Sequence, residues 1–364
     1  PQLTRPAIVR RRPSLHVQPP LLASFVGLRE VILDDVQMGG RIDPVHGHRL
    51  AFERLMGGLA GVALQKLSLR RTGMTGADLV LLADHIRGHT LQSLDLKSNR
   101  ITHLEDPVVA MLTQRVRRVV LSNNPINNVG DLLAALNQGS PLTELYLRSV
   151  GLEGMDLYYN LLEALQWRTS LSKIDVRDNP DINFDPLFVM QAVAQSKTLR
   201  ELMVGSVSGV PGPRGGVQEA APEKPKKGTK LHALRFAGPM TAPMLEELGR
   251  FFETRSRLNH LTFDGPVDAA ALPALLKVKS LCTLSLGEWT GDRHASRDLG
   301  RALWANPTLH SLDVRGRISF GAVMNIVAGV RAEEAQAQAS WNQDQRHLHS
   351  RYHNSQRRVS RHLR

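Results

Sequence analysis

The sequence has 364 residues, of which 42% are hydrophobic and 5% aromatic, with one cysteine and a formal net charge of +12. A single cysteine excludes an intrachain disulfide and argues against a disulfide-stabilised secreted protein. The longest apolar runs are shorter than the roughly 20 residues that cross a bilayer, so no membrane span is predicted. A leucine-rich, aromatic-poor composition predicts a core of repeated small layers.

The positive charge lies in three segments outside the body of the chain. Residues 1–20 contain four arginines and no acid, residues 206–230 contain five cations and two acids, and residues 340–364 contain six arginines and one acid. These segments account for the whole net charge, so the remainder of the chain is formally neutral. We therefore predict a neutral body with basic extensions.

The first segment, residues 1–20, contains five prolines and is predicted to form an extended basic arm. We expect Arg10, Arg11 and Arg12 to contact RNA or an acidic partner. An arginine-rich, acid-free segment is typical of a mitochondrial presequence or its remnant. The expected location is therefore the mitochondrial matrix, with the cytoplasm or a flagellum as alternatives.

A leucine pattern recurs after this arm, and Leu91–Ile101 (LQSLDLKSNRI) shows it most clearly. Three leucines alternate with polar residues, and Asn99 follows the strand-like stretch. Successive repeats from Leu64 onward begin 23 to 32 residues apart. This pattern resembles the leucine-rich repeat, L-x-x-L-x-L-x-x-N, in the longer form of the ribonuclease-inhibitor family. The eleven repeats begin at Leu28, Leu64, Leu91, Val116, Leu142, Leu171, Leu199, Leu231, Leu258, Leu281 and Leu309.

The resemblance implies an α/β fold, a curved leucine-rich repeat solenoid over residues 21–330 with parallel strands on the concave face and helices outside. Stretches such as 76–88 and 129–139 are the predicted helices, since their apolar residues recur at three and four and a glycine ends each. Asn99, Asn124 and Asn179 are expected to be structural turn residues that bond the backbone of the turn and of the adjacent coil. Repeats that lack this amide, such as the one with Val150, should be less regular.

Residues 206–230 interrupt the solenoid with a stretch rich in glycine, proline and lysine, which predicts a flexible insertion. Its lysines are interpreted as solvated, with contact to a partner as the alternative.

The C-terminal segment, residues 331–364, contains no glycine or proline and predicts a helix. Its apolar residues Trp341, Leu348, Tyr352, Val359 and Leu363 recur at intervals of seven and four, which forms a single stripe. We expect the alanine-rich first half to cap the solenoid and the second half to extend away. The residues expected to contact RNA or an acidic partner are Arg346, Arg351, Arg357, Arg358, Arg361 and Arg364.

One column of outward strand positions is basic in the N-terminal half, with Arg70, Lys97, Arg148 and Arg177 as candidate concave-face contacts. Acids at the preceding outward positions, such as Asp95, would partly neutralise it. Two interpretations remain open at this stage. The column is either a solvated face with salt bridges or a contact surface for an acidic protein or a phosphate backbone.

No catalytic residues are predicted, because no Ser/His/Asp arrangement or carboxylate pair stands out. No cofactor or metal site is predicted either. His85 and His89 have the spacing of two helical zinc ligands, but no cysteine or acidic cluster accompanies them. Histidines 347, 349 and 353 would add pH-dependent charge to the tail. Cys282 needs no role beyond packing.

Known proteins of this repeat type narrow the expected function. Ribonuclease inhibitors are acidic and cysteine-rich, and the activators of the Ran GTPase carry an acidic tail, whereas this chain is basic. The resemblance and the charge together favour a non-catalytic scaffold in a large ribonucleoprotein, such as a mitochondrial ribosome or its assembly intermediate. Its extensions would contact ribosomal or other structured RNA, and its solenoid would contact proteins. Alternatives are a flagellar, axonemal or other cytoskeletal scaffold and a soluble protein-binding adaptor, none with a small-molecule substrate.

Overall fold

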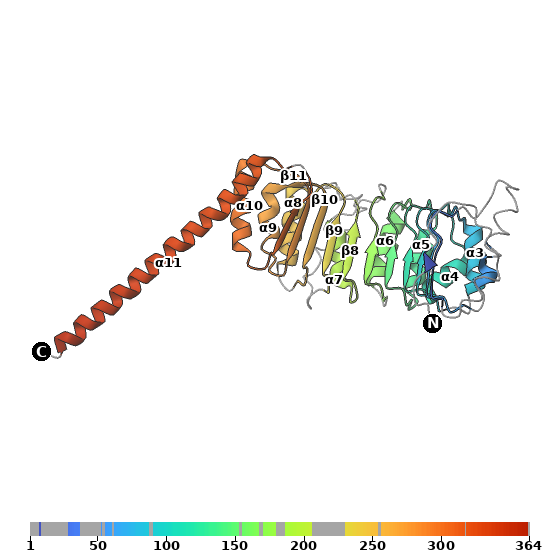
Figure 1. Cartoon of the computed structure of the whole chain (residues 1–364), viewed down its shortest axis with the longest axis horizontal. Coiled ribbons are helices and arrows are strands. Elements are labelled where there is room, and N and C mark those ends of the chain that lie inside the picture. Colours follow the sequence, from blue (N-terminus) through green and yellow to red (C-terminus); the bar gives the residue numbers. More distant parts are fainter. Residues whose placement is uncertain are drawn as a thin grey trace.

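The computed structural model shows an elongated α/β solenoid with an open parallel sheet on one side and helices on the other (Figure 1). The predicted fold class, a leucine-rich repeat solenoid, is confirmed. The structure describes residues 7–8, 28–36, 52, 55–59, 62–86, 90–152, 155–166, 170–179, 186–205, 230–253, 256–316 and 318–362.

Each of the eleven predicted repeats contains one strand, from β2 to β12, and each strand pairs in parallel with its sequence neighbours. A two-residue strand, β1, precedes them and pairs with β2. The strands are β1 (Ala7–Ile8), β2 (Glu30–Ile32), β3 (Lys66–Ser68), β4 (Ser93–Asp95), β5 (Arg118–Val120), β6 (Glu144–Tyr146), β7 (Lys173–Asp175), β8 (Glu201–Val204), β9 (Ala233–Phe236), β10 (His260–Asp268), β11 (Thr283–Thr290) and β12 (Ser311–Val314).

Helices connect most of the successive strands, and the two that the sequence predicted are present as α3 and α5. Gly139 follows α5 with a φ of +90°, a conformation that glycine adopts without steric cost. The helices are α3 (Gly76–His85), α4 (Asp106–Gln114), α5 (Val129–Leu136), α6 (Met155–Gln166), α7 (Pro186–Gln195), α8 (Ala242–Phe252), α9 (Leu272–Leu275), α10 (Arg293–Ala305) and α11 (Phe320–His362), with a short 3₁₀ helix, η2 (Ala269–Ala271), before α9.

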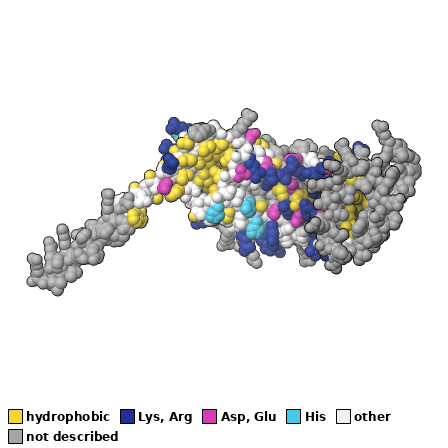
Figure 2. All heavy atoms as spheres, in the orientation of Figure 1, with side chains coloured by type: hydrophobic (Ala, Val, Ile, Leu, Met, Phe, Trp, Pro, Cys, Tyr) yellow, Lys and Arg dark blue, Asp and Glu magenta, His cyan; other side chains and the backbone are white. Residues whose placement is uncertain are grey.

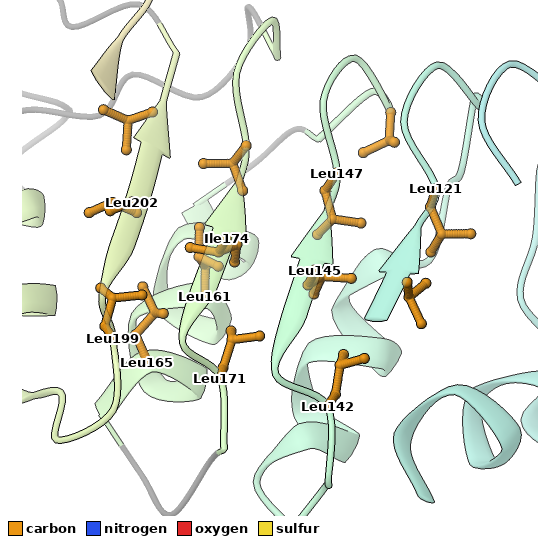
Figure 3. Packing of buried hydrophobic residues seen from close by; sticks show 14 of the residues in the cluster. Leu121, Leu142, Leu145, Leu147, Leu161, Leu165, Leu171, Ile174, Leu199 and Leu202 are labelled. Carbon is orange, nitrogen blue, oxygen red and sulfur yellow. The ribbon is translucent and has the colours of Figure 1, made fainter. Parts of the chain in front are cut away.

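The core is a continuous layer of aliphatic side chains between the sheet and the helices. In Figure 3, Leu142, Leu145 and Leu147 of one coil and Leu161 and Leu165 of α6 all lie in this layer. Each is at most 1% exposed, so each contributes roughly 1.5–3 kcal/mol of burial. Stacking therefore supplies the stability that no single repeat has alone.

The last helix, α11, starts at Phe320, eleven residues before the predicted segment 331–364, and continues to His362. Gly321 and Gly329 lie within it, which is why the sequence pattern placed its start too late. Gly329 has a structural reason: α11 crosses α10 there, and a Cβ on Gly300 or Gly329 would overlap the backbone of the other helix. After this crossing the helix leaves the body (Figure 1).

Two predicted segments lie largely outside the described residues. These are the arm at 1–20, of which only β1 is described, and the insertion at 206–230, of which only Lys230 is described.

Candidate functional site

The asparagines of the repeat bind the backbone of the turn after each strand. The Asn99 side-chain amide donates to the carbonyls of Leu69 (2.7 Å) and Leu96 (2.8 Å). Its Oδ1 atom accepts hydrogen bonds from the backbone N–H groups of Thr72 (3.0 Å) and Met74 (3.1 Å). One buried side chain thus satisfies four main-chain groups. Three belong to the preceding coil and one, the Leu96 carbonyl, belongs to its own coil.

The same arrangement recurs at Asn124 and Asn179, which bond back to the preceding coils in the same way. Val150 lacks an amide, yet its coil stays connected: the Val150 carbonyl accepts from the N–H of Ile126 at 3.0 Å. A backbone oxygen therefore takes part of the role of the missing side chain. These residues are structural and leave the concave face as the first candidate interaction surface.

Three of the four candidate concave-face cations are paired with acids. Arg70 donates to Asp95 at 2.5 and 2.8 Å, and Arg148 forms an ion pair with Asp178. The hydrogen bond to Asp95 raises the pKa of Arg70, against the opposing effect of burial. Because these partners neutralise the cations locally, the pairs leave little net charge for a ligand.

Arg177 belongs to a network that spans four coils. Its guanidinium donates to Asp175 at 2.7 and 2.9 Å and to Asp264 at 3.4 Å. Asp264 also accepts two hydrogen bonds of 2.7 Å from Arg235. The intervening positions of the column are the small residues Gly205 and Ala237, which leave room for the Arg177 side chain to cross β8 and β9.

The electrostatics of this network favour the charged forms. The hydrogen bond to Asp175 raises the pKa of Arg177, again against burial. Burial raises the pKa of Asp264, but this effect is outweighed by the hydrogen bond and charge of Arg235 and by the charge of Arg177. The pKa of Asp264 is therefore lowered from its ordinary value of 3.8. The network therefore joins β7, β9 and β10 across the sheet and is not a free cationic site.

Lys97 is the exception among the candidates. Within the part of the chain that the structure describes, no carboxylate lies within ion-pair distance of its ammonium group, although its backbone N–H donates to Asp95 at 3.1 Å. One half-buried lysine is a small contact surface.

Tyr146 lies at the centre of the concave face between two cations, Arg118 and Lys173. Their charged groups lie 5.0 and 5.8 Å from the ring centroid, and the Tyr146 hydroxyl donates to Glu144 at 3.0 Å. Burial and the negative charge of Glu144 raise the pKa of Tyr146. Glu144 also pairs with Arg118, and Lys173 pairs with Glu201, so this cluster is internally satisfied too.

The remaining exposed surface of interest is apolar and lies at the C-terminal end. Trp304 on α10 is 46% exposed, and Val323, Val327 and Trp341 on α11 are 38%, 36% and 59% exposed. Figure 2 shows hydrophobic side chains over this end of the body and along the first part of the projecting helix. The neighbouring strand β12 is only partly buried, because no further strand covers it among the described residues.

Sequence reasoning missed some of these residues. The pairing of Asp264 with Arg177 joins residues 87 positions apart, and no local pattern signals it. The exposed valines of α11 do have a signal: Val323 precedes Trp341 by 18 residues, which is five helical turns.

Several candidate residues fall outside what the structure describes. Arg10, Arg11, Arg12, His89 and Arg364 are not described, and for Arg346, Arg351, Arg357, Arg358 and Arg361 only the helical backbone is. His85 Nδ1 lies 2.8 Å from the Leu81 carbonyl. Among the described residues, no group of three or more His, Cys, Asp or Glu side chains is placed to hold a metal ion. A search of the same residues finds no helix with the length and apolar character of a membrane span.

Comparisons with known proteins give similar solved structures and no relative in sequence. No protein-family model matches the sequence, and no curated protein does. Similar solved structures include the yeast complex of Rad7 and Elc1 (19% identity, TM-score 0.47, 79% of this chain and 69% of that one). An internalin from Listeria monocytogenes matches at 15% identity, TM-score 0.43 and coverages of 76% and 67%. The leucine-rich repeat protein LegL7 from Legionella pneumophila matches at 14% identity and a TM-score of 0.44, over 86% of this chain and 94% of that one.

Proposed function

We propose that this chain is a non-catalytic interaction scaffold and a structural component of a large ribonucleoprotein, such as a mitochondrial ribosome or its assembly intermediate. The solenoid is the protein-binding body, as its fold suggests, and the C-terminal helix contacts structured RNA. The mitochondrial matrix is the location that goes with this proposal.

One observation carries the proposal: the cations of the body and those of the C-terminal segment differ in their surroundings. The concave-face arginines Arg70, Arg148 and Arg177 are each bound to carboxylates. Residues 340–364, in contrast, contain six arginines against one acid, on a helix that extends away from the body. Positive charge without local acids is what a phosphate backbone binds, and the released counterions drive the association.

The test measures RNA binding of the full chain as a function of salt. A tail variant replaces five arginines by glutamine, and a control variant makes the same change of charge on the body. We expect binding by the wild type and the control with the same log–log salt slope, and a slope shallower by up to about 4 units in the tail variant. The tail positions are Arg346, Arg351, Arg357, Arg358 and Arg361, and the control positions, all exposed, are Arg100, Arg117, Arg257, Arg293 and Arg297.

Two results would overturn the proposal. One is equal loss of RNA binding in both variants, which would make the interaction a matter of net charge alone. The other is the absence of RNA binding by the wild type. Binding to microtubules, with their acidic surface, would then favour the cytoskeletal scaffold.

A further inference from the structure

The parallel sheet ends at β12, whose outer edge has no partner strand among the described residues. The Arg315 N–H donates to the Leu286 carbonyl of β11 at 2.8 Å, so the main-chain groups at this position face β11. Because successive residues of a strand direct these groups to opposite sides, those of Leu312 and Val314 face away from β11. Their N–H and C=O groups form an open edge that another strand can bond.

The inward side chains of β12 are less buried than those of the strand before it. Leu284 and Leu286 of β11 are 0% exposed, because the last coil covers them. The residues in register with them, Leu312 and Val314, are only partly buried. The last helix, α11, packs against α10 on the helical side of the solenoid (Figure 1). An open sheet edge with apolar side chains behind it is a place at which chains pair.

A second copy of the chain fits this edge in one antiparallel register. The open main-chain groups can bond only where Leu312 and Val314 lie opposite residues whose groups also face outward. With Val314 opposite Val314 of the other copy, Asp313 of each copy lies opposite Arg315 of the other on the concave face. The register with Leu312 opposite Val314 would instead bring the two Asp313 carboxylates together. The register with Leu312 opposite itself would pair no opposite charges.

Asp313 and Arg315 are accessible for this contact. Within one copy they form an ion pair of 2.7 Å, and their side chains are 46% and 53% exposed. A carboxylate accepts several hydrogen bonds and a guanidinium donates up to five, so each side chain can bond across the edge without losing its own partner. The four charges of two copies would form one cluster in which every nearest neighbour has the opposite sign.

We propose that β12 pairs with β12 of a second copy, antiparallel and centred on Val314, to form an end-to-end dimer. The contact uses the same surface on both copies, so the two-fold symmetry closes the assembly at two chains. It bonds the open edge and covers the apolar side chains behind it. The dimer does not depend on the proposed function, and it presents two C-terminal helices on one particle.

The test is sedimentation equilibrium of the full chain with exchanged charges. Asp313→Arg places arginine opposite Arg315 of the other copy, and Arg315→Asp places two carboxylates opposite each other. Each variant should therefore fail to pair with itself, whereas an equal mixture of the two should pair, because opposite charges again face each other. Both positions are exposed, so both variants should fold like the wild type. Arg100→Asp, at an exposed position on another coil, makes the same change of charge as Arg315→Asp and is the control.

We expect the wild type and Arg100→Asp to dimerise with dissociation constants within about twofold of each other, and each edge variant alone to associate at least about tenfold more weakly. The mixture of the two edge variants should recover most of the wild-type affinity. The inference is overturned by a monomeric wild type, by assemblies that grow beyond two chains, or by edge variants that dimerise like the wild type. Edge variants that stay monomeric when mixed would also overturn it, because recovery in the mixture requires Asp313 opposite Arg315. Failure of RNA binding would remove the proposed function and leave the dimer intact.

Discussion

The N-terminal and C-terminal coils share one leucine spacing but leave their strands in different ways. The strands β3 to β7 are three residues long, and each is followed by a turn with a residue in the left-handed region, such as Arg71, Ser98 or Asn123, at φ values near +55° to +60°. In contrast, β10 and β11 continue for nine and eight residues, past the position at which the N-terminal coils turn.

Each half satisfies the backbone after its strands with a different group. In the N-terminal half the amides of Asn99, Asn124 and Asn179 bond the turns. In the C-terminal half main-chain pairing continues, and glycines allow the coils to approach: a Cβ on Gly287 would overlap the Asp264 backbone, and one on Gly265 would lie 2.6 Å from the Gly238 carbonyl. The leucine pattern therefore specifies the stacking of the coils and leaves the closure of each coil to other residues.

The largest effect is expected from removing the side-chain amide of Asn124, which is 1% exposed and makes hydrogen bonds to its own coil and to the preceding one. Asn124→Ala should lower the free energy of unfolding by about 4 kcal/mol, because several buried main-chain groups lose their partners. Denaturant unfolding measures this. Asn127→Ala, at an exposed asparagine three residues away, should change stability by less than about 0.5 kcal/mol. Similar losses in both variants would mean that the amide bonds are not what closes this coil.

A smaller loss of stability is expected from disturbing the close approach of the C-terminal coils at Gly287. Gly287→Ala should destabilise the protein by about 3 kcal/mol, since the added methyl group meets backbone and not a movable side chain. Hydrogen exchange should show the loss in β10 and β11, with β3 to β7 unchanged. The matched control is Gly57→Ala, at an exposed helical glycine with open space around it, which should be neutral or slightly stabilising. A neutral Gly287→Ala would show that the coils can separate there at no cost.

The smallest effect concerns Asp264, which links Arg177 of the N-terminal coils to Arg235 of the C-terminal ones. Its pKa is lowered in the folded protein, so its contribution to stability is present above pH 3.8 and is lost as the pH falls through the lower folded value. Asp264→Asn should therefore reduce the acid-induced loss of stability below pH 4, measured by unfolding across pH. Asp298→Asn, at an exposed ion pair, is the control and should leave that loss unchanged. An unaltered pH profile in Asp264→Asn would count against the network as a link between the halves.

The sequence was sufficient to predict the repeats, because the inward leucines recur at fixed offsets and each predicted repeat has its strand. The turn positions of Asn99, Asn124 and Asn179 follow from the same pattern. The long strands β10 and β11 were not predictable, since they depend on how closely two coils approach at Gly265 and Gly287. The partner of Arg177 was equally hidden, because it lies three coils away and is reached only across small residues.

The crossing of α10 and α11 sets where the arginines of the C-terminal segment lie in space. From Gly329 to His362 the helix is about 50 Å long, so a change of about 10° in the crossing angle moves its far end by about 9 Å. At Gly300 and Gly329 the two helices approach backbone to backbone, so a side chain at either position would have to push them apart. A larger residue at either position would keep every arginine in the protein and yet move the whole set to a different place.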